Sequence, residues 1–309
     1  MIEKLVDIGT KKLQVSIHGD GAPIVVIETG MGCSWYDFSK VIEEISKNAT
    51  VLTYHRSGYG KSTLGKEERT TKQIAVDFNE LLEIEGINCP IILVGHSFGG
   101  LCVQHFACLF PEKVAAMVLI DSNSSGEYKM DKLRDKLPNF KNTFSKNKII
   151  DNWRGLSQKS KDELKTIISP ELLIEQRELI EEIQKCILEF QINPGMYSAM
   201  ASELELMSQS GQEIEKRFKQ LDVPLIVLGR DKALGIKWNV DMGIPQEEAV
   251  QFESLWSSLV REEANNSAKG QFIEVKGSRH SIYRTNPEVV IKAINDILSE
   301  IYMIDINEN

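Results

Sequence analysis

A serine set among glycines lies about a third of the way along the chain, in the run Gly95-His96-Ser97-Phe98-Gly99-Gly100. An apolar run, Ile91-Ile92-Leu93-Val94, precedes it, and the apolar residues from 101 to 107 predict a helix after it. Strand, sharp turn and helix together are the setting of a nucleophile elbow, whose flanking positions require glycine. The pattern therefore predicts Ser97 as a nucleophile. The alternative is a glycine-rich phosphate loop, but neither GxGxxG nor GxxxxGK(S/T) occurs here.

A serine hydroxyl needs a neighbouring base to become a good nucleophile, and the chain offers five histidines. His280 lies in a loop between the last predicted strand and a C-terminal helix, so the serine comes first and the histidine last, as in other chains with this elbow. We therefore predict His280 as the base. His96 is expected to point away from the site, and His105 and His18 to have structural roles. No histidine pair has HExxH spacing, so we expect no metal.

Composition narrows the class of protein. The chain has 309 residues, 42% of them apolar and 26% charged, and a formal net charge of −9. This length can bury a sizeable core, and the acidic balance argues against nucleic acid or an anionic membrane as partner. Five cysteines without a CxxC pair indicate a reducing compartment. Neither a signal peptide nor an apolar membrane span is evident, so we expect a cytoplasmic protein. No feature of the sequence indicates the oligomeric state.

Short apolar runs rich in β-branched residues recur along the chain. Such runs without polar alternation are typical of strands covered on both faces, as in a parallel sheet. Segments with helical periodicity, 71–82 and 287–301, lie between or after them. The alternation predicts an α/β fold with a doubly wound, mostly parallel sheet. The predicted strands are 24–27, 51–54, 91–94, 117–120, 225–228 and 272–275.

The stretch from 124 to 220 interrupts this alternation, because it contains no strand pattern. Ser169-Pro170 predicts a helix start, followed by an amphipathic stripe that ends at Asn193-Pro194-Gly195. We interpret 124–220 as a helical cap inserted into a core formed by 1–123 and 221–309. Most of its apolar faces are expected to serve packing, and some to line a substrate pocket.

The Gly-His-Ser-Phe-Gly-Gly-Leu run at 95–101 resembles the nucleophile elbow of the α/β-hydrolase superfamily. Two departures stand out: Glu28-Thr29 replaces the usual histidine of a His-Gly pair after the third strand, and His55 replaces the usual aspartate of an Asp-Arg-x-Gly-x-Gly-x-Ser loop. Neither residue supplies the nucleophile. Other segments that resemble family motifs are 55–62, 110–114, 118–121, 277–280 and 286–288.

The resemblance also implies an oxyanion hole made of two backbone N–H groups. Phe98, the residue after the nucleophile, supplies one. Met31, directly after Gly30, is implied as the other. A plain flexible turn at Thr29-Gly30-Met31-Gly32 is the alternative.

The acid that would orient His280 has two candidates. Most superfamily members place it after the seventh strand in a Gly-x-x-Asp pattern, but here Asp231 comes one position early after Gly229. Some members place it directly after the sixth strand, where Asp121 stands. We favour Asp121 and keep Asp231 as the alternative, whereas Asp222 comes before the strand.

These residues predict a serine hydrolase that cleaves an ester of a small, partly apolar substrate through an acyl-enzyme, as a carboxylesterase does, without a cofactor. Thioesterase, aminopeptidase and lactonase activities are alternatives within the same fold. A catalytically inactive binding protein is the alternative from another class, because the fold also carries such proteins.

Overall fold

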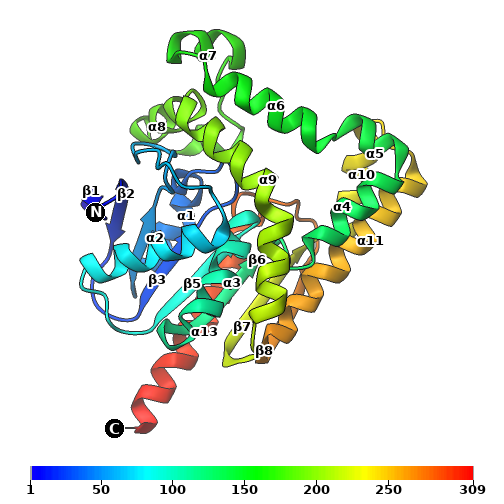
Figure 1. Cartoon of the computed structure of the whole chain (residues 1–309). Helices are drawn as coiled ribbons and strands as arrows, with labels where there is room; N and C mark the ends of the chain where they lie inside the picture. Colours follow the sequence, from blue (N-terminus) through cyan, green and yellow to red (C-terminus); the bar gives the residue numbers. More distant parts are fainter. Residues whose placement is uncertain (1, 309) are drawn as a thin grey trace.

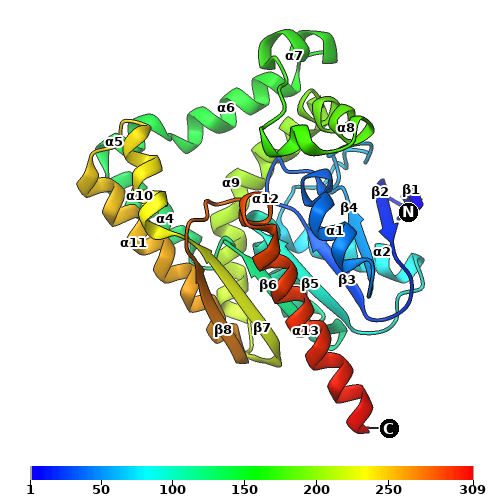
Figure 2. The same cartoon turned by 180° about the vertical axis from the view of Figure 1, so that it is seen from behind.

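The computed structural model describes residues 2–308. Within them, eight strands form one sheet in the order β1-β2-β4-β3-β5-β6-β7-β8 (Figures 1 and 2). β1 pairs with β2 and β2 with β4 in antiparallel fashion, and the remaining pairs are parallel. The predicted mostly parallel sheet is therefore confirmed, with an antiparallel N-terminal edge added. The strands are β1 Ile2–Asp7, β2 Lys12–His18, β3 Ile24–Glu28, β4 Thr50–Tyr54, β5 Ile91–His96, β6 Val114–Ile120, β7 Leu221–Arg230 and β8 Ser267–Val275.

Helices cover both faces of the sheet, which explains the continuous apolar runs. In β3, Val25 and Ile27 pack into a core with helices α1 and α13, whereas Val26 packs into a core with α2 and α3 on the opposite face. Helix α11 joins the second core through Val260. The helices outside the 124–220 segment are α1 Ser39–Ile45, α2 Thr71–Ile84, α3 Phe98–Leu109, α10 Lys232–Asp241, α11 Gln246–Glu262, α12 Ile282–Thr285 and α13 Pro287–Glu308.

Residues 124–220 are helical and contain no strand. One expected boundary is wrong: Ser169 ends α7 in a left-handed conformation (φ 48°), so no helix starts at Pro170. Asn193-Pro194 starts a further helix, because the Asn193 side chain accepts a hydrogen bond from the Gly195 N–H and proline suits the first helical position. The helices are α4 Glu127–Lys136, α5 Pro138–Thr143, α6 Lys146–Ser157, α7 Lys161–Ile168, α8 Glu181–Gln191 and α9 Pro194–Arg217.

This helical segment leaves the sheet at the carboxyl end of β6, next to the end of β5 that carries Ser97. Helix α6 spans the top of the molecule between α5 and α7, and α9 runs back toward the sheet (Figure 1). α9 packs against α2 and α3, and its Met200 lies against the loop at Met31 and Gly32. The insertion therefore touches the loop that was expected to hold the oxyanion.

A buried guanidinium joins the insertion to the core. Arg56, in the loop after β4, donates from Nε to the Glu203 carboxylate of α9 at 3.0 Å and from Nη1 to the Glu28 carboxylate at 2.5 Å. It also donates to the carbonyl oxygens of Thr29 and Gly30, at 2.6 and 3.0 Å. Arg56 and Glu203 are both almost completely buried. The glutamate that replaces the family's histidine therefore serves as a partner of Arg56.

Because a buried ion pair is costly to break, Glu203→Ala is expected to lower the free energy of unfolding by about 3–5 kcal/mol, by leaving Arg56 without one carboxylate. Urea unfolding followed by circular dichroism measures this. The control is Glu205→Gln on the same helix, whose ion pair with Arg154 is about half exposed, with an expected change of at most about 1 kcal/mol. Equal effects of the two substitutions would contradict the role given to Arg56.

Candidate active site

Ser97 occupies the sharp turn between β5 and α3, with a backbone conformation of φ 53° and ψ −124°. An added Cβ on Gly95 would lie 2.6 Å from the Cα of Gly100, and one on Gly99 would lie 2.3 Å from the carbonyl oxygen of Glu28. Both glycines are therefore required for close packing. A serine held in this sparsely populated region is strained by about 1–3 kcal/mol, which its packed surroundings must offset. The local structure is the predicted elbow.

His280 contacts Ser97 and Asp121 at once. Its Nε2 lies 3.0 Å from Ser97 Oγ, and its Nδ1 lies 2.6 Å from Asp121 Oδ2. It sits in the loop between β8 and α12, with its side chain 40% exposed. His96 donates from Nε2 to the His280 carbonyl oxygen at 3.2 Å, since a carbonyl oxygen can only accept, and burial lowers the pKa of His96 well below its ordinary value. The expectation that His96 points away from the site is therefore wrong, because its ring lies beside that of His280 with the centroids 4.7 Å apart.

Asp121 is fully buried directly after β6, with a positive φ of 40°. One carboxylate oxygen accepts from the indole N–H of Trp256 at 3.0 Å, and the other from Arg230 Nη1 at 2.8 Å. Burial alone would raise the pKa of Asp121, but the attraction of Arg230 and the hydrogen bond from His280 outweigh it. The pKa is held well below its ordinary value, so Asp121 remains an anion.

Arg230 continues this line of contacts to a second carboxylate. At the end of β7 it forms a bidentate pair with Glu253 of α11, with Nη2 at 2.8 and 2.9 Å from the two oxygens. Ser97, His280, Asp121, Arg230 and Glu253 are thus joined in sequence. We did not predict Arg230 or Glu253. The one available signal was the position of Arg230 at the end of an apolar strand, beside the candidate Asp231.

Asp231 lies elsewhere. Its backbone is extended, and its side chain turns back to cap α10, accepting from the Ala233 N–H at 2.9 Å and from the Gly277 N–H at 3.0 Å. Bonds to these N–H groups, that of Gly277 first, lower the pKa of Asp231. Within residues 2–308, the carboxylate in contact with His280 is that of Asp121, so Asp231 does not meet the geometric requirement for the alternative acid.

The other three histidines bind structural partners. His55 is buried between Ser34 Oγ and Gln14 Oε1, both at 2.9 Å, and burial lowers its pKa well below the ordinary value. His105 contacts the Thr71 hydroxyl at 2.7 Å, and His18 contacts that of Ser16 at 2.8 Å.

The loop at Gly30 and Met31 lies against the elbow. An added Cβ on Gly30 would lie 3.2 Å from the Cβ of Ser97. The carbonyl group of Gly30 points to Arg56, and the N–H of a trans peptide points opposite to its carbonyl. The Met31 N–H is therefore directed away from Arg56. Phe98 is the buried first residue of α3, so its N–H belongs to the free N-terminal turn of that helix.

The side chain of Asn123 also contacts Ser97, and that of Glu127 binds Asn123 in turn. The Ser97 hydroxyl lies 3.3 Å from Asn123 Oδ1, and Asn123 Nδ2 donates to Glu127 at 2.9 Å. Glu127 starts α4 and is buried, and burial raises its pKa to about 7. We did not predict either residue, because polar residues after a strand and at a helix start are common.

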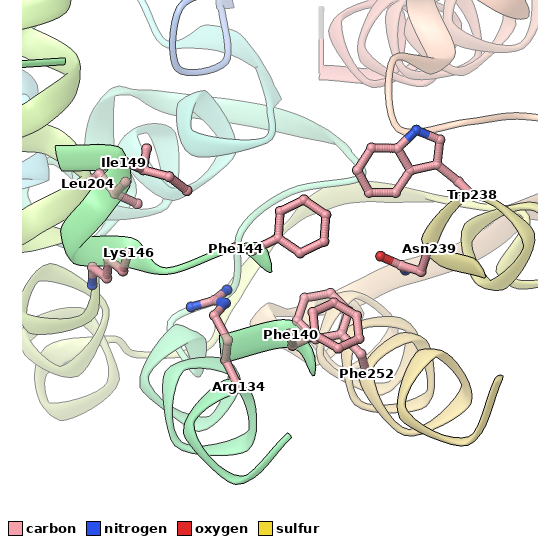
Figure 3. A pocket seen from close by; sticks show the side chains of 9 residues that line it. All are labelled: Arg134, Phe140, Phe144, Lys146, Ile149, Leu204, Trp238, Asn239 and Phe252. Atoms are coloured by element: carbon pink, nitrogen blue, oxygen red, sulfur yellow. The ribbon is translucent and has the colours of Figure 1, made fainter. Parts of the chain in front are cut away.

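A cavity of about 560 Å³ opens beside His280, and its walls include Arg279, Trp238 and Phe252. A second pocket of about 220 Å³ shares Trp238, Asn239 and Phe252 with it. Figure 3 shows this second pocket, which we name the aromatic pocket. Its apolar walls come from α5, α6, α9, α10, α11 and the segment after α5: Phe140, Phe144, Ile149, Leu204, Trp238 and Phe252.

Within the part of the chain that the structure describes, no group of three or more His, Cys, Asp or Glu side chains is arranged to hold a metal ion. Across the same residues, no helix has the length and apolar character needed to cross a bilayer.

A curated relative resembles the chain over most of its length. An AB hydrolase superfamily protein of Gibberella zeae is 23% identical over 89% of this chain and 86% of its own length. The matches to three other curated relatives span 20%, 41% and 40% of those proteins.

Two solved structures share the fold. The enol-lactonase of Burkholderia xenovorans LB400 has a TM-score of 0.63 at 16% identity, over 96% of this chain and 100% of its own. A thermophilic esterase of Thermogutta terrifontis has a TM-score of 0.62 at 18% identity, over 96% and 98%. The sequence model of the alpha/beta hydrolase fold family matches residues 23–231, more than half of the chain. Family model, sheet order and elbow agree, and the chain belongs to the alpha/beta hydrolase fold family.

Proposed function

We propose that the protein is a serine hydrolase that cleaves an ester, or a related acyl bond, of a small and partly apolar substrate through an acyl-enzyme. The observation that carries the proposal is the continuous line from Ser97 Oγ to His280 Nε2 at 3.0 Å and from His280 Nδ1 to Asp121 at 2.6 Å. Nucleophile, base and orienting carboxylate at hydrogen-bond distance are the arrangement that activates a serine hydroxyl.

In this mechanism Ser97 Oγ attacks the substrate carbonyl carbon while His280 accepts the hydroxyl proton. The N–H groups of Phe98 and Met31 stabilise the negative charge on the carbonyl oxygen. His280 then protonates the leaving group, and water repeats the cycle to release the acid. Asp121, kept ionised by Arg230, orients the imidazole and stabilises its protonated form.

The insertion at 124–220 acts as a cap in this proposal. Its helix α9 contacts the Met31 loop, and its helices α5 and α6 supply walls of the aromatic pocket. The cap therefore selects the substrate, while the core at 1–123 and 221–309 carries the chemistry. Relatives named as lipase, carbamate hydrolase and esterase are consistent with acyl-bond cleavage.

Ser97→Ala is expected to reduce hydrolysis of 4-nitrophenyl esters to background, because the variant has no hydroxyl to form the acyl-enzyme. Initial rates at 400 nm measure the loss, and circular dichroism checks that the fold is kept. Ser124→Ala, a hydroxyl deletion near the insertion boundary, is the control and should retain activity. A purified Ser97→Ala protein with more than a few percent of wild-type turnover would exclude Ser97 as nucleophile.

Asp121→Asn is expected to lower kcat by about 10⁴-fold, the loss seen when the acid of a serine triad becomes an amide. Asp231→Asn removes a carboxylate at the N-cap of α10 and should leave kcat within a few fold of the wild type, with a stability loss of at most about 1 kcal/mol. Steady-state kinetics and thermal unfolding distinguish the two variants. The reverse ranking of kcat would identify Asp231 as the functional acid.

The titration of Glu127 is expected to make the free energy of unfolding depend on pH. Its pKa is about 7 in the folded protein and about 4.5 in the unfolded chain, so between these values the folded state binds more protons. Stability should therefore fall as the pH rises from about 4.5 to about 7, by up to about 3 kcal/mol at the full shift. Urea midpoints of the wild type and Glu127→Gln, compared across this range, isolate the effect. Parallel pH profiles would show that Glu127 has no raised pKa.

A further inference from the structure

Two cations and a single carboxylate lie at one end of the aromatic pocket. Arg134 of α4 and Lys146 of α6 both line the pocket, and both pair with Asp131, at 2.5 and 2.8 Å. The three side chains are only 19%, 21% and 24% exposed. Because two positive charges share one negative charge in a poorly solvated place, the cluster carries an excess positive charge that an anion would neutralise.

The cluster and the cavity beside His280 lie at different parts of the aromatic pocket. Figure 3 shows Lys146 on one side, Trp238 and Asn239 on the other, and Arg134 reaching between Lys146 and the stacked rings of Phe140 and Phe252. Trp238 and Asn239 also border the cavity beside His280. The aromatic pocket and the cavity beside His280 therefore share an aromatic wall, and the cations lie away from that wall in the aromatic pocket.

Helix α4 carries both this cluster and a residue that is linked to Ser97. Asp131 and Arg134 lie four and seven residues after Glu127, so all three share one face of α4. Glu127 bonds to Asn123, and Asn123 contacts the Ser97 hydroxyl. Glu127 is also titratable, and burial raises its pKa to about 7, so it is mainly neutral at about pH 6.

We propose that the aromatic pocket is a substrate subsite for an apolar chain or ring that ends in a carboxylate, with Arg134 and Lys146 binding that carboxylate. This inference rests on the proposed function, because it places the reacting bond of the substrate at Ser97. The volume of about 220 Å³ suits such a group, since a cavity of about 150 Å³ already binds benzene. The substrate class is then a mono-ester of a dicarboxylic acid, or an ester of a hydroxy acid.

The test compares matched esters at about pH 6. On the acid side, 4-nitrophenyl hexanoate is compared with mono-4-nitrophenyl adipate; on the alcohol side, hexyl acetate is compared with 6-acetoxyhexanoate. Hydrogen bonds to a charged group are worth about 1.5–3 kcal/mol, so the carboxylate-bearing ester of at least one pair should have a kcat/KM about tenfold higher or more. Each pair has equal chain length, so the ratio isolates the charge.

Four variants test where the carboxylate is recognised. Lys146→Gln should reduce the ratio of kcat/KM for the charged ester to that for the neutral ester toward one. Asp131→Asn should increase this ratio, because both cations lose their shared partner. Lys148→Gln on the same helix is exposed and should change nothing. Arg279→Gln removes a cation at the His280 cavity instead, and loss of the preference there would overturn the assignment to the aromatic pocket.

A binding measurement needs no turnover. Hexanoate should raise the thermal midpoint of the wild type more than hexan-1-ol does, and Lys146→Gln should abolish the difference. Two results together would overturn the subsite: hydrolysis of the charged and neutral esters at equal kcat/KM, and equal stabilisation by hexanoate and hexan-1-ol. They would leave the proposed hydrolase function intact. A hexanoate effect without hydrolysis of any ester would support the subsite and count against the proposed function.

Discussion

The strained backbone of Ser97 is the constraint on which the rest of the structure depends. A serine with φ 53° at the end of β5 requires glycine at 95 and 99, since added Cβ atoms there would collide with backbone atoms. It also requires neighbours that hold the turn in place. The ends of β3 and β6 press against the elbow from two sides, and each then carries a loop that the site uses: Gly30-Met31 after β3, and Asp121 to Asn123 after β6.

Two arginines, Arg56 fully buried and Arg230 largely buried, hold these loops, and each pairs with two carboxylates. Arg56 binds Glu28 and Glu203 and orients the carbonyl groups before Met31, while Arg230 binds Asp121 and Glu253. An isolated buried guanidinium would be very unfavourable, so each pair must form together with the elements that carry it. The position of the insertion and the ionisation of Asp121 therefore depend on long-range ion pairs within the fold.

The parts of this arrangement that could be predicted from sequence are those with a local signal. Ser97 lies in a strand-turn-helix pattern, the central strands are continuous apolar runs, and His280 stands at the expected place after the last strand. Asp121 was favoured over Asp231 because it ends an apolar strand directly, and the observed contact with His280 agrees with that preference. The roles of Ser97, His280, Asp121, Met31 and Phe98 in catalysis stay predictions.

The residues that were missed depend on partners far away in the chain. Arg230 and Asp121 are 109 residues apart, and Arg56 and Glu203 are 147 apart, so no window of sequence contains both members of either pair. The prediction that a helix starts at Pro170 was wrong for a different reason. Ser169 takes a left-handed conformation that ends α7, and a Ser-Pro pair is equally compatible with a helix end and a helix start.

The central claim is that Ser97 becomes covalently attached to the acyl group, and mass spectrometry of the protein treated with a fluorophosphonate tests it most directly. The account predicts one adduct per chain, located by peptide mapping on Ser97, and much slower labelling of a His280→Ala variant, because the base that activates the hydroxyl is missing. The absence of an adduct on the folded protein, or an adduct on another residue at the same rate in both proteins, would contradict it.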